Sequence, residues 1–132
     1  MPRVTIFYQV GSTYRAGPVL QAKQFCGALT KMTEAPELRF IPYKKGRLAY
    51  REAGVGRTLL FLHGMNGNSK SWAFAFQALS PTFRVVAWDA PSCGKSDCFG
   101  DSLEDYVTAV KALIWSLELQ DVVVIGHSMG GL

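Results

Sequence analysis

Val122-Val123-Val124-Ile125-Gly126-His127-Ser128-Met129-Gly130-Gly131-Leu132 is the stretch that decides the fold. Its four leading apolar residues are typical of a buried strand in a parallel sheet. The residues that follow have the spacing G-x-S-x-G of a nucleophile elbow, in which a serine stands at the apex of a sharp turn from strand to helix. Gly126 and Gly130 suit such a turn, because the residues two before and two after the serine crowd each other. We therefore interpret Ser128 as a candidate nucleophile at the end of a buried strand.

The residues before this stretch alternate between strand and helix patterns. Two strand-like segments on either side of a turn at Gly46 predict a hairpin. After them, short apolar runs predict two strands, and apolar residues at helical spacing predict two helices. The predicted ranges are strands 38–43, 47–53, 58–62 and 83–88, a helix 69–79, and a helix from a capping box at Ser102 and Asp105 to Leu117. This order predicts an α/β fold, with helices on both faces of a mostly parallel sheet and an antiparallel hairpin before it.

Three loops, at residues 63–68, 89–98 and 126–131, each follow a predicted parallel strand. Ligand sites of open α/β sheets gather at the carboxyl ends of the strands. We therefore expect these loops to converge on one crevice.

The first 37 residues show no clean periodicity, and we leave 1–37 as an unassigned leader before a domain at 38–132. Residues 1–31 hold four basic residues and no acidic one, which resembles a transit peptide in charge alone. The interpretation we favour is that translation begins at Met32, or that these residues are disordered.

The composition narrows the class of protein. Residues 32–132 contain ten of the 14 Lys and Arg residues and all ten Asp and Glu residues, so their net charge is zero. We therefore expect no nucleic-acid partner. No apolar run approaches the ~20 residues of a membrane span. The three cysteines have no C-x-x-C spacing, which predicts reduced thiols in the cytoplasm and no metal or disulfide framework.

From about Leu38 to Leu132 the sequence resembles the α/β-hydrolase family. The resemblance rests on an apolar strand ending in His63-Gly64, on Trp88-Asp89-Ala90-Pro91 with Gly94, Ser96 and Asp97, and on the elbow at 126–131. The few residues around Trp88 are similar to the enol-lactonase, haloperoxidase and small esterase branches. The resemblance implies an α/β-hydrolase fold that stops after the nucleophile elbow.

The resemblance also implies roles for single residues. Ser128 would attack the carbonyl of an ester, lactone or similar small acyl substrate, forming an acyl-enzyme without cofactor or metal. The backbone N–H groups of Met65 and Met129 would bind the oxyanion, while His63 and Gly64 would be structural. A serine nucleophile argues against an alkyl-halide dehalogenase.

The general base is the gap in this assignment. The family's triad runs Ser, then Asp or Glu, then His, whereas His63 and His127 both precede Ser128. We expect the acid and base beyond Leu132, and residues 1–132 alone to be inactive. In the family, the strand 122–125 pairs with a strand after the elbow, so we also expect an open, aggregation-prone edge here. The oligomeric state is not predicted.

The loop at 89–98 departs from the family at two positions. Ser92 replaces a glycine and Cys93 a position that is often aromatic. If the position of Ser92 has positive φ, serine is strained there by about 1 kcal/mol or more. We expect Ser96 and Asp97 to hold this loop together and to take no part in catalysis.

Two alternatives of other classes stay open. Gly64 to Ser71 is one residue from a phosphate-binding loop, and Asp89 to Ser96 is a second near match, but each lacks a required glycine. A binding or signalling protein could also keep the hydrolase scaffold without turnover.

Overall fold

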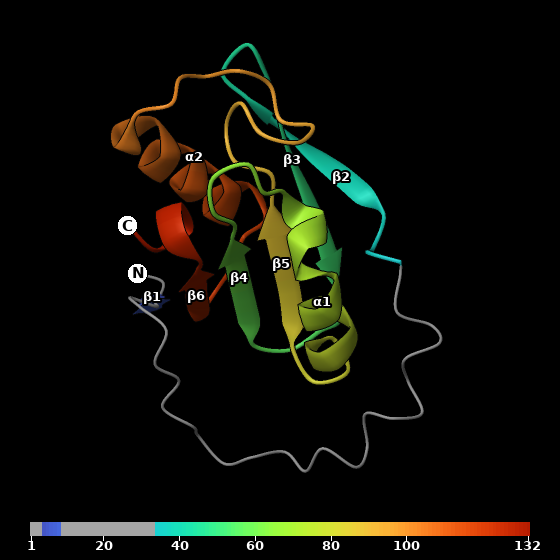
Figure 1. Ribbon diagram of the computed structural model, residues 1–132. Helices are drawn as coiled ribbons and strands as arrows, with labels where there is room; N and C mark the ends of the chain where they lie inside the picture. Colours follow the sequence, from blue (N-terminus) through green and yellow to red (C-terminus); the bar gives the residue numbers. More distant parts are fainter. Residues whose placement is uncertain (1–3, 9–33) are drawn as a thin grey trace.

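The computed structural model describes residues 4–8 and 34–132 of the chain (Figure 1). The elements in chain order are β1 (Val4–Tyr8), β2 (Leu38–Tyr43), β3 (Gly46–Ala53), β4 (Thr58–Leu62), η3 (Ser69–Trp72), α1 (Ala73–Leu79), β5 (Arg84–Trp88), α2 (Leu103–Ser116), β6 (Val122–Gly126) and η4 (Ser128–Gly131). The η elements are single turns of 3-10 helix.

The described strands form one six-stranded sheet in the order β1-β6-β4-β5-β3-β2. β4 pairs in parallel with both β5 and β6, whereas β3 is antiparallel to β5 and to β2. The predicted fold class is therefore confirmed: a mostly parallel sheet is preceded by an antiparallel hairpin.

The two α-helices cover opposite faces of this sheet (Figure 1). Leu60, Val86 and Val124 pack in one core with Leu113 of α2. The alternate residues of the same three strands pack in a second core with Phe76 of α1; they include Leu59, Phe61, Val85 and Val123. Successive side chains of a strand point to opposite faces, which explains why all five residues of β4 are buried, as predicted.

The predicted hairpin is confirmed, but its glycine has a different task. Tyr43 pairs with Gly46, so Lys44 and Lys45 form the turn, and Lys44 has the positive φ of 50°. A Cβ on Gly46 would lie 2.4 Å from Oδ2 of Asp97. The glycine is thus required by the close approach of the loop after β5, and not by the turn.

The predicted helices are found with small changes. The first begins as the 3-10 turn η3, capped by Asn68, and becomes α-helical only at Ala73. The second, α2, has the predicted capping box of Ser102 and Asp105.

The predicted open edge of β6 is wrong for this chain. β1 pairs in parallel with β6, with Val4 opposite Val122 and Tyr8 opposite Gly126. The physical reason is visible in the sequence: Val4 to Tyr8 is an unbroken run of β-branched and aromatic residues, the composition favoured in strands. The start at Met32 and the boundary of the leader stay predictions, and residues 9–33 lie outside the described residues.

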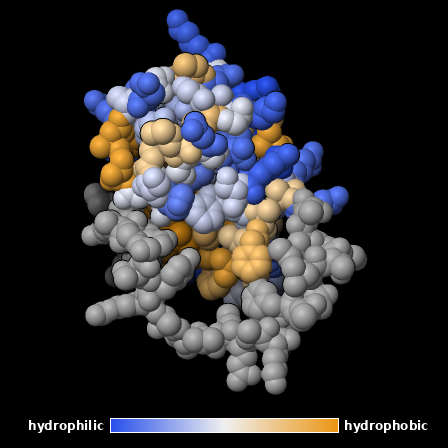
Figure 2. Space-filling view, viewed as in Figure 1, coloured by the Kyte–Doolittle hydropathy of each residue, from blue (hydrophilic) through white to orange (hydrophobic). Residues whose placement is uncertain are grey.

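The outside of the described part is mixed in polarity. Figure 2 shows hydrophilic residues over much of its upper part and apolar ones lower down. Among the described residues, no helix is long and apolar enough to span a bilayer.

Candidate active site

The elbow is a strained turn that its glycines make possible. Ser128 is exposed and has φ 52°, the left-handed conformation expected of a serine at the apex of an elbow. A Cβ on Gly126 would lie 2.1 Å from the carbonyl oxygen of Gly130, and one on Gly130 would lie 2.3 Å from that of Leu62. Both contacts are with backbone, so neither glycine can be replaced without moving β4 or the turn.

The loop after β4 is fixed by the side chain of His63. This side chain is only 2% exposed, and its Nε2 accepts a hydrogen bond of 2.9 Å from Ala90 N. Because Nε2 is an acceptor, Nδ1 carries the proton, which it donates to the carbonyl oxygen of Gly64 at 2.7 Å. Gly67 N donates to the same oxygen. His63 thus makes the backbone hydrogen bonds expected of it, and both of its nitrogens are occupied.

The loop and the elbow meet at Gly64. A Cβ built there would lie 3.2 Å from Cβ of Ser128 and 2.9 Å from Nδ1 of His127, so a side chain here would require the elbow side chains to shift. Met65 and Met129, the two residues predicted to donate to an oxyanion, line one pocket of about 380 Å³. Within the described residues, neither of their backbone N–H groups donates a hydrogen bond to the protein.

A buried carboxylate that was not predicted as a site residue ties two loops together. Asp89 is 2% exposed and accepts hydrogen bonds from Ser69 N at 2.7 Å and from Lys95 N at 2.8 Å. A Cβ on Gly94 would lie 2.1 Å from its Oδ2. The signal was available, because a carboxylate directly after an apolar strand must find donors when it is buried. Asp89 therefore anchors the loop that follows β5.

Two neighbours complete the attachment of this loop, as predicted. Ser96 Oγ donates to the carbonyl oxygen of Asp89 at 2.6 Å and accepts from Ala49 N at 2.8 Å. Asp97 Oδ2 accepts from Arg47 N at 2.9 Å. Ser96 is thus held by backbone of the hairpin and of its own loop, and Asp97 by backbone of the hairpin.

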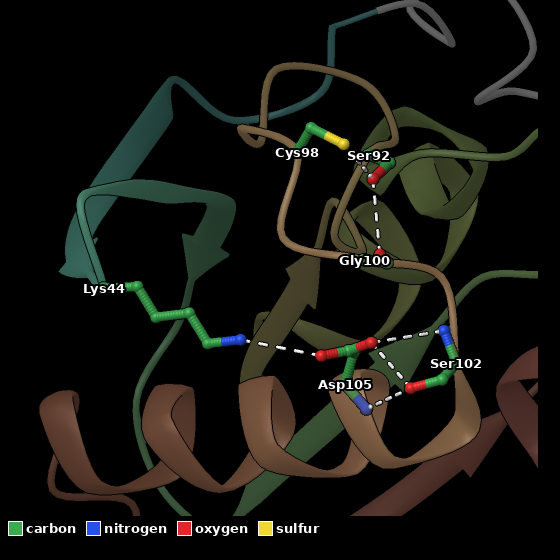
Figure 3. A network of polar contacts seen from close by, with 6 residues as sticks. All are labelled: Lys44, Ser92, Cys98, Gly100, Ser102 and Asp105. Carbon is green, nitrogen blue, oxygen red and sulfur yellow. Dashed lines mark hydrogen bonds and ion pairs between the residues drawn. The ribbon is translucent and has the colours of Figure 1, made fainter.

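Ser92, which stands where the family has a glycine, has a positive φ of 64°. The strain expected for a serine in this conformation therefore applies. Its hydroxyl lies 3.2 Å from Cys98 Sγ and 3.4 Å from the carbonyl oxygen of Gly100 (Figure 3). The hydroxyl of Ser92, followed by the backbone of Gly100, lowers the pKa of the Cys98 thiol. The side chain that strains the backbone thus also closes the loop on itself.

The comparisons with known proteins agree with this geometry. The sequence model of the Alpha/beta hydrolase family matches residues 59–132, more than half of the chain. The chain belongs to the α/β-hydrolase family. A 2-hydroxy-6-oxononadienedioate/2-hydroxy-6-oxononatrienedioate hydrolase of Dechloromonas aromatica is 35% identical over 112 residues, which are 76% of this chain and 39% of that protein.

Solved structures of α/β-hydrolase proteins have the same arrangement. The N-acyl homoserine lactonase AidH, complexed with N-butanoyl homoserine, has a TM-score of 0.67 at 32% identity, covering 72% of this chain and 37% of that one. The epoxide hydrolase VrEH1 of Vigna radiata has a TM-score of 0.66 at 29% identity, covering 71% and 32%. The chain spans only 22% to 40% of the length of the first curated relatives it matches.

Two further side chains that line this pocket were not predicted as site residues. Cys93 and Tyr106 line the pocket together with Met65 and Met129. Burial, followed by the nearby Asp89 carboxylate, raises the pKa of the Cys93 thiol. A thiol held protonated is a small, weakly polar wall. Tyr106 lies on α2, which was predicted as a helix but not as part of a pocket wall.

The same geometry argues against a phosphate-binding loop. The Asp89 carboxylate accepts from the N–H of Ser69, at the start of η3 where a bound phosphate would need free donors. Asn68 Oδ1 takes the next N–H, that of Lys70. The N–H groups of Ser69 and Lys70 are therefore already used by side-chain oxygens. Among the described residues, no cluster of three or more His, Cys, Asp or Glu residues could hold a metal ion.

Proposed function

We propose that this chain carries the nucleophile and the oxyanion-binding groups of a serine hydrolase that acts on an ester, lactone or similar small acyl substrate. The observation that carries the proposal is the elbow: an exposed Ser128 at φ 52°, between two glycines that admit no Cβ. When a strained backbone conformation falls on the residue at the apex of a turn and the flanking residues are glycines, the turn exposes the side chain of the apex residue.

In this proposal Ser128 Oγ attacks the carbonyl carbon, the carbonyl π electrons move to oxygen, and a base removes the hydroxyl proton. The oxyanion is bound by the N–H groups of Met65 and Met129, two residues that line one pocket and whose N–H groups have no described protein partner. Removing one such donor typically costs about 3–4 kcal/mol of transition-state stabilisation. Collapse of the tetrahedral adduct breaks the bond to the leaving oxygen, which takes the proton from the base to form the alcohol, and leaves the acyl group on Ser128.

Neither histidine of the chain is proposed as the base. His63 is held by backbone groups at both nitrogens, and its side chain is buried under the loop. His127 occupies the variable position of the elbow and precedes the nucleophile. The chain therefore supports binding and nucleophilic roles, and the acid and base are expected elsewhere in the whole protein.

The substrate class is proposed from the pocket and the relatives together. Most side chains that line the pocket are apolar or weakly polar; they include Met65, Cys93, Leu103, Tyr106 and Met129. One relative is named as hydrolysing 2-hydroxy-6-oxononadienedioate, and one neighbouring structure is named as a homoserine lactonase. Compounds of these two kinds define the first panel to test.

The test is covalent labelling of the protein expressed from its complete reading frame. A fluorophosphonate probe should form an adduct on Ser128, located by peptide mass mapping, and Ser128→Ala should abolish it. Ser92→Ala is the matched control, because Ser92 borders the pocket with positive φ but has no proposed chemistry. A folded protein that takes no label would exclude a nucleophilic Ser128 and favour a scaffold without turnover.

A further inference from the structure

One wall of the pocket that holds the predicted oxyanion donors carries a negative charge. Asp101 and Asn66 line this pocket together with Met65 and Met129. Of the described residues that line it, Asp101 is the one that is charged at neutral pH, and none is Lys, Arg or His. The part of the wall that this chain supplies is therefore apolar or neutral except at one carboxylate.

The Asp101 carboxylate is not neutralised by a described neighbour. Within residues 4–8 and 34–132, its side chain takes part in no ion pair or hydrogen bond. Lys44, which faces the same end of α2, is bound instead to Asp105 at 3.5 Å (Figure 3). An unpaired carboxylate acts with its full charge on whatever enters the pocket beside it.

The start of α2 does not offset this charge. The N-terminus of a helix carries a partial charge of about +0.5, which by itself would attract an anion. The first turn of α2 already contains two carboxylates, those of Glu104 and Asp105, and Asp105 also caps the helix through Ser102. One lysine and this partial charge do not balance three carboxylates. The potential at this side of the pocket is therefore negative.

Tyr106, which lines the same pocket, responds to this potential. Burial raises the pKa of its hydroxyl, and Cys93, Asp101 and Asp105 raise it further. Carboxylates that disfavour a phenolate at Tyr106 also disfavour another anion beside it. The pocket volume of about 380 Å³ corresponds to a sphere roughly 9 Å across, close to the Debye length of about 8 Å at physiological salt. A charge on a bound molecule therefore lies within range of Asp101.

We propose that Asp101 makes this pocket select against acyl groups that carry a negative charge, so that the substrate is neutral where it meets this wall. The inference rests on the serine hydrolase proposed above and narrows its substrate class. Of the two kinds of compound named for similar proteins, a dioate brings carboxylates, whereas an acylated homoserine lactone is uncharged. Asp101 favours the second kind, a lactone or an ester whose acyl chain ends without a carboxylate.

The test compares two p-nitrophenyl esters that differ in one group. The first is the monoester of adipate, whose free end is a carboxylate, and in the second a methyl group replaces the charged oxygen to give a ketone. Their kcat/KM values are measured for the protein expressed from its complete reading frame and for its variants Asp101→Asn and Glu104→Gln. Glu104 is the matched control, because it brings the same charge to the start of α2 but does not line the pocket. Any wall that other parts of the protein add is common to all three proteins.

The parent protein should prefer the neutral ester, and Asp101→Asn should reduce this preference about 3- to 10-fold at low salt. The reduction should shrink at ~1 M NaCl, where the Debye length falls to about 3 Å, a response that a change of shape alone would not give. Glu104→Gln should change the preference by less than about twofold. A parent preference for the anionic ester, an unchanged preference in Asp101→Asn, or an equal change in Glu104→Gln would overturn the proposal.

A second readout needs no turnover. The affinities of the two esters for the complete protein carrying Ser128→Ala, measured by calorimetry, should show the same preference and the same loss of it with Asp101→Asn. This binding preference without hydrolysis by the parent would contradict the nucleophile proposed at Ser128 and support the role of Asp101. Hydrolysis with a preference that does not respond to Asp101→Asn would do the opposite. Binding of neither ester would overturn the assignment of this pocket to acyl compounds, and the role of Asp101 with it.

Discussion

Ser128 and Ser92 both hold left-handed backbone on loops that border the same pocket, with φ values of 52° and 64°. Around Ser128 the neighbours are reduced to hydrogen, because Gly126 and Gly130 touch backbone wherever a Cβ would stand. Around Ser92 the residue two before is Ala90, and Gly94 two after approaches a side chain, that of Asp89, and not backbone. The Ser92 hydroxyl lies in hydrogen-bond range of a thiol and a carbonyl oxygen. The tight glycines of the elbow leave the Ser128 hydroxyl exposed, whereas the Ser92 hydroxyl is used to bond its own loop.

The difference teaches that backbone strain alone does not identify a functional residue. Non-glycine residues at positive φ occur at six described positions: Lys44, Asn66, Ser92, Glu118, Asp121 and Ser128. What separates Ser128 from the other five is the combination of exposure, backbone contact at both flanking glycines and a neighbouring pocket. Substitutions in the two loops can break or sharpen this comparison.

The largest effect is expected from Gly130→Ala, which breaks the elbow. The new Cβ would lie 2.3 Å from the Leu62 carbonyl oxygen and 2.8 Å from that of His63, so β4 or the turn must move. We expect a loss of about 3–5 kcal/mol in the free energy of unfolding, measured with urea. Ser128→Ala is the control, since it adds no atom to this contact, and it should stay within about 0.5 kcal/mol. Equal stability of the two variants would contradict the tight approach.

The second effect breaks the loop after β5. Asp89→Ala removes the acceptor of two N–H groups, the buried one of Ser69 and the partly buried one of Lys95, and leaves them without this partner. We expect a loss of about 2–4 kcal/mol in the free energy of unfolding. Asp97→Ala is the matched control, because that carboxylate accepts one N–H at an exposed site and should cost about 1 kcal/mol or less. Similar losses for both would show that Asp89 is not the anchor of the loop.

Much of this architecture could be predicted because it depends on short-range patterns. The apolar strands, the capping box at Ser102 and the elbow at 126–131 are local signals, and all lie where the sequence placed them. The clamp at Asp89 depends on Ser69, twenty residues away, and on a loop whose course no periodicity fixes. The place of Gly46 against Asp97 was missed for the same reason, since it depends on an approach between distant segments.

The strand Val4–Tyr8 was missed for another reason. Its residues carry a clear strand pattern, but it lies within an acid-free stretch, up to residue 31, that resembles a leader in charge. The partner strand, β6, lies more than a hundred residues later, so nothing local could indicate the pairing. Strand propensity shows that a segment can pair, whereas only the assembled sheet shows with which edge.

The third effect sharpens the comparison by placing glycine at each strained serine. Ser128→Gly and Ser92→Gly should both relieve positive φ, and relief of this kind is worth about 1 kcal/mol. Ser128→Gly should therefore stabilise the fold by about that amount. Ser92→Gly should gain less, because it also loses the hydroxyl contacts with Cys98 and Gly100. A larger gain at Ser92 than at Ser128, measured by urea unfolding, would remove the role assigned to its hydroxyl.

The same substitution has a chemical readout. The hydroxyl of Ser92 is the main cause that lowers the pKa of the Cys98 thiol, so Ser92→Gly should raise that pKa toward its usual value. The rate of alkylation of Cys98 by iodoacetamide, followed against pH, reports the thiolate fraction. The midpoint of this profile should move to higher pH in the variant. The profile of Cys93 serves as an internal reference, because its pKa is raised by burial and by Asp89.

The smallest effect concerns the helix that follows the loop. Asp105 caps α2 through Ser102 and lies 3.5 Å from Lys44 (Figure 3). The Ser102 hydroxyl is the first cause that lowers the pKa of the Asp105 carboxyl from its ordinary value of 3.8, and Lys44 contributes less. A carboxyl whose pKa is lower when folded contributes stability that is fully present above the unfolded pKa and lost as pH falls through the folded pKa.

The stability difference between the parent chain and Asp105→Asn should therefore be constant above about pH 5 and should shrink below about pH 4. Lys44→Met separates the two causes: it should leave most of this pH dependence in place, whereas Ser102→Ala should remove most of it. Urea unfolding at a series of pH values measures all four chains. A pH dependence that disappears with Lys44→Met and survives Ser102→Ala would assign the effect to the hairpin and not to the cap. The Lys44–Asp105 ion pair would then hold the hairpin turn to α2. Charge would fix the contact at this turn, whereas close backbone contacts at glycines fix the elbow.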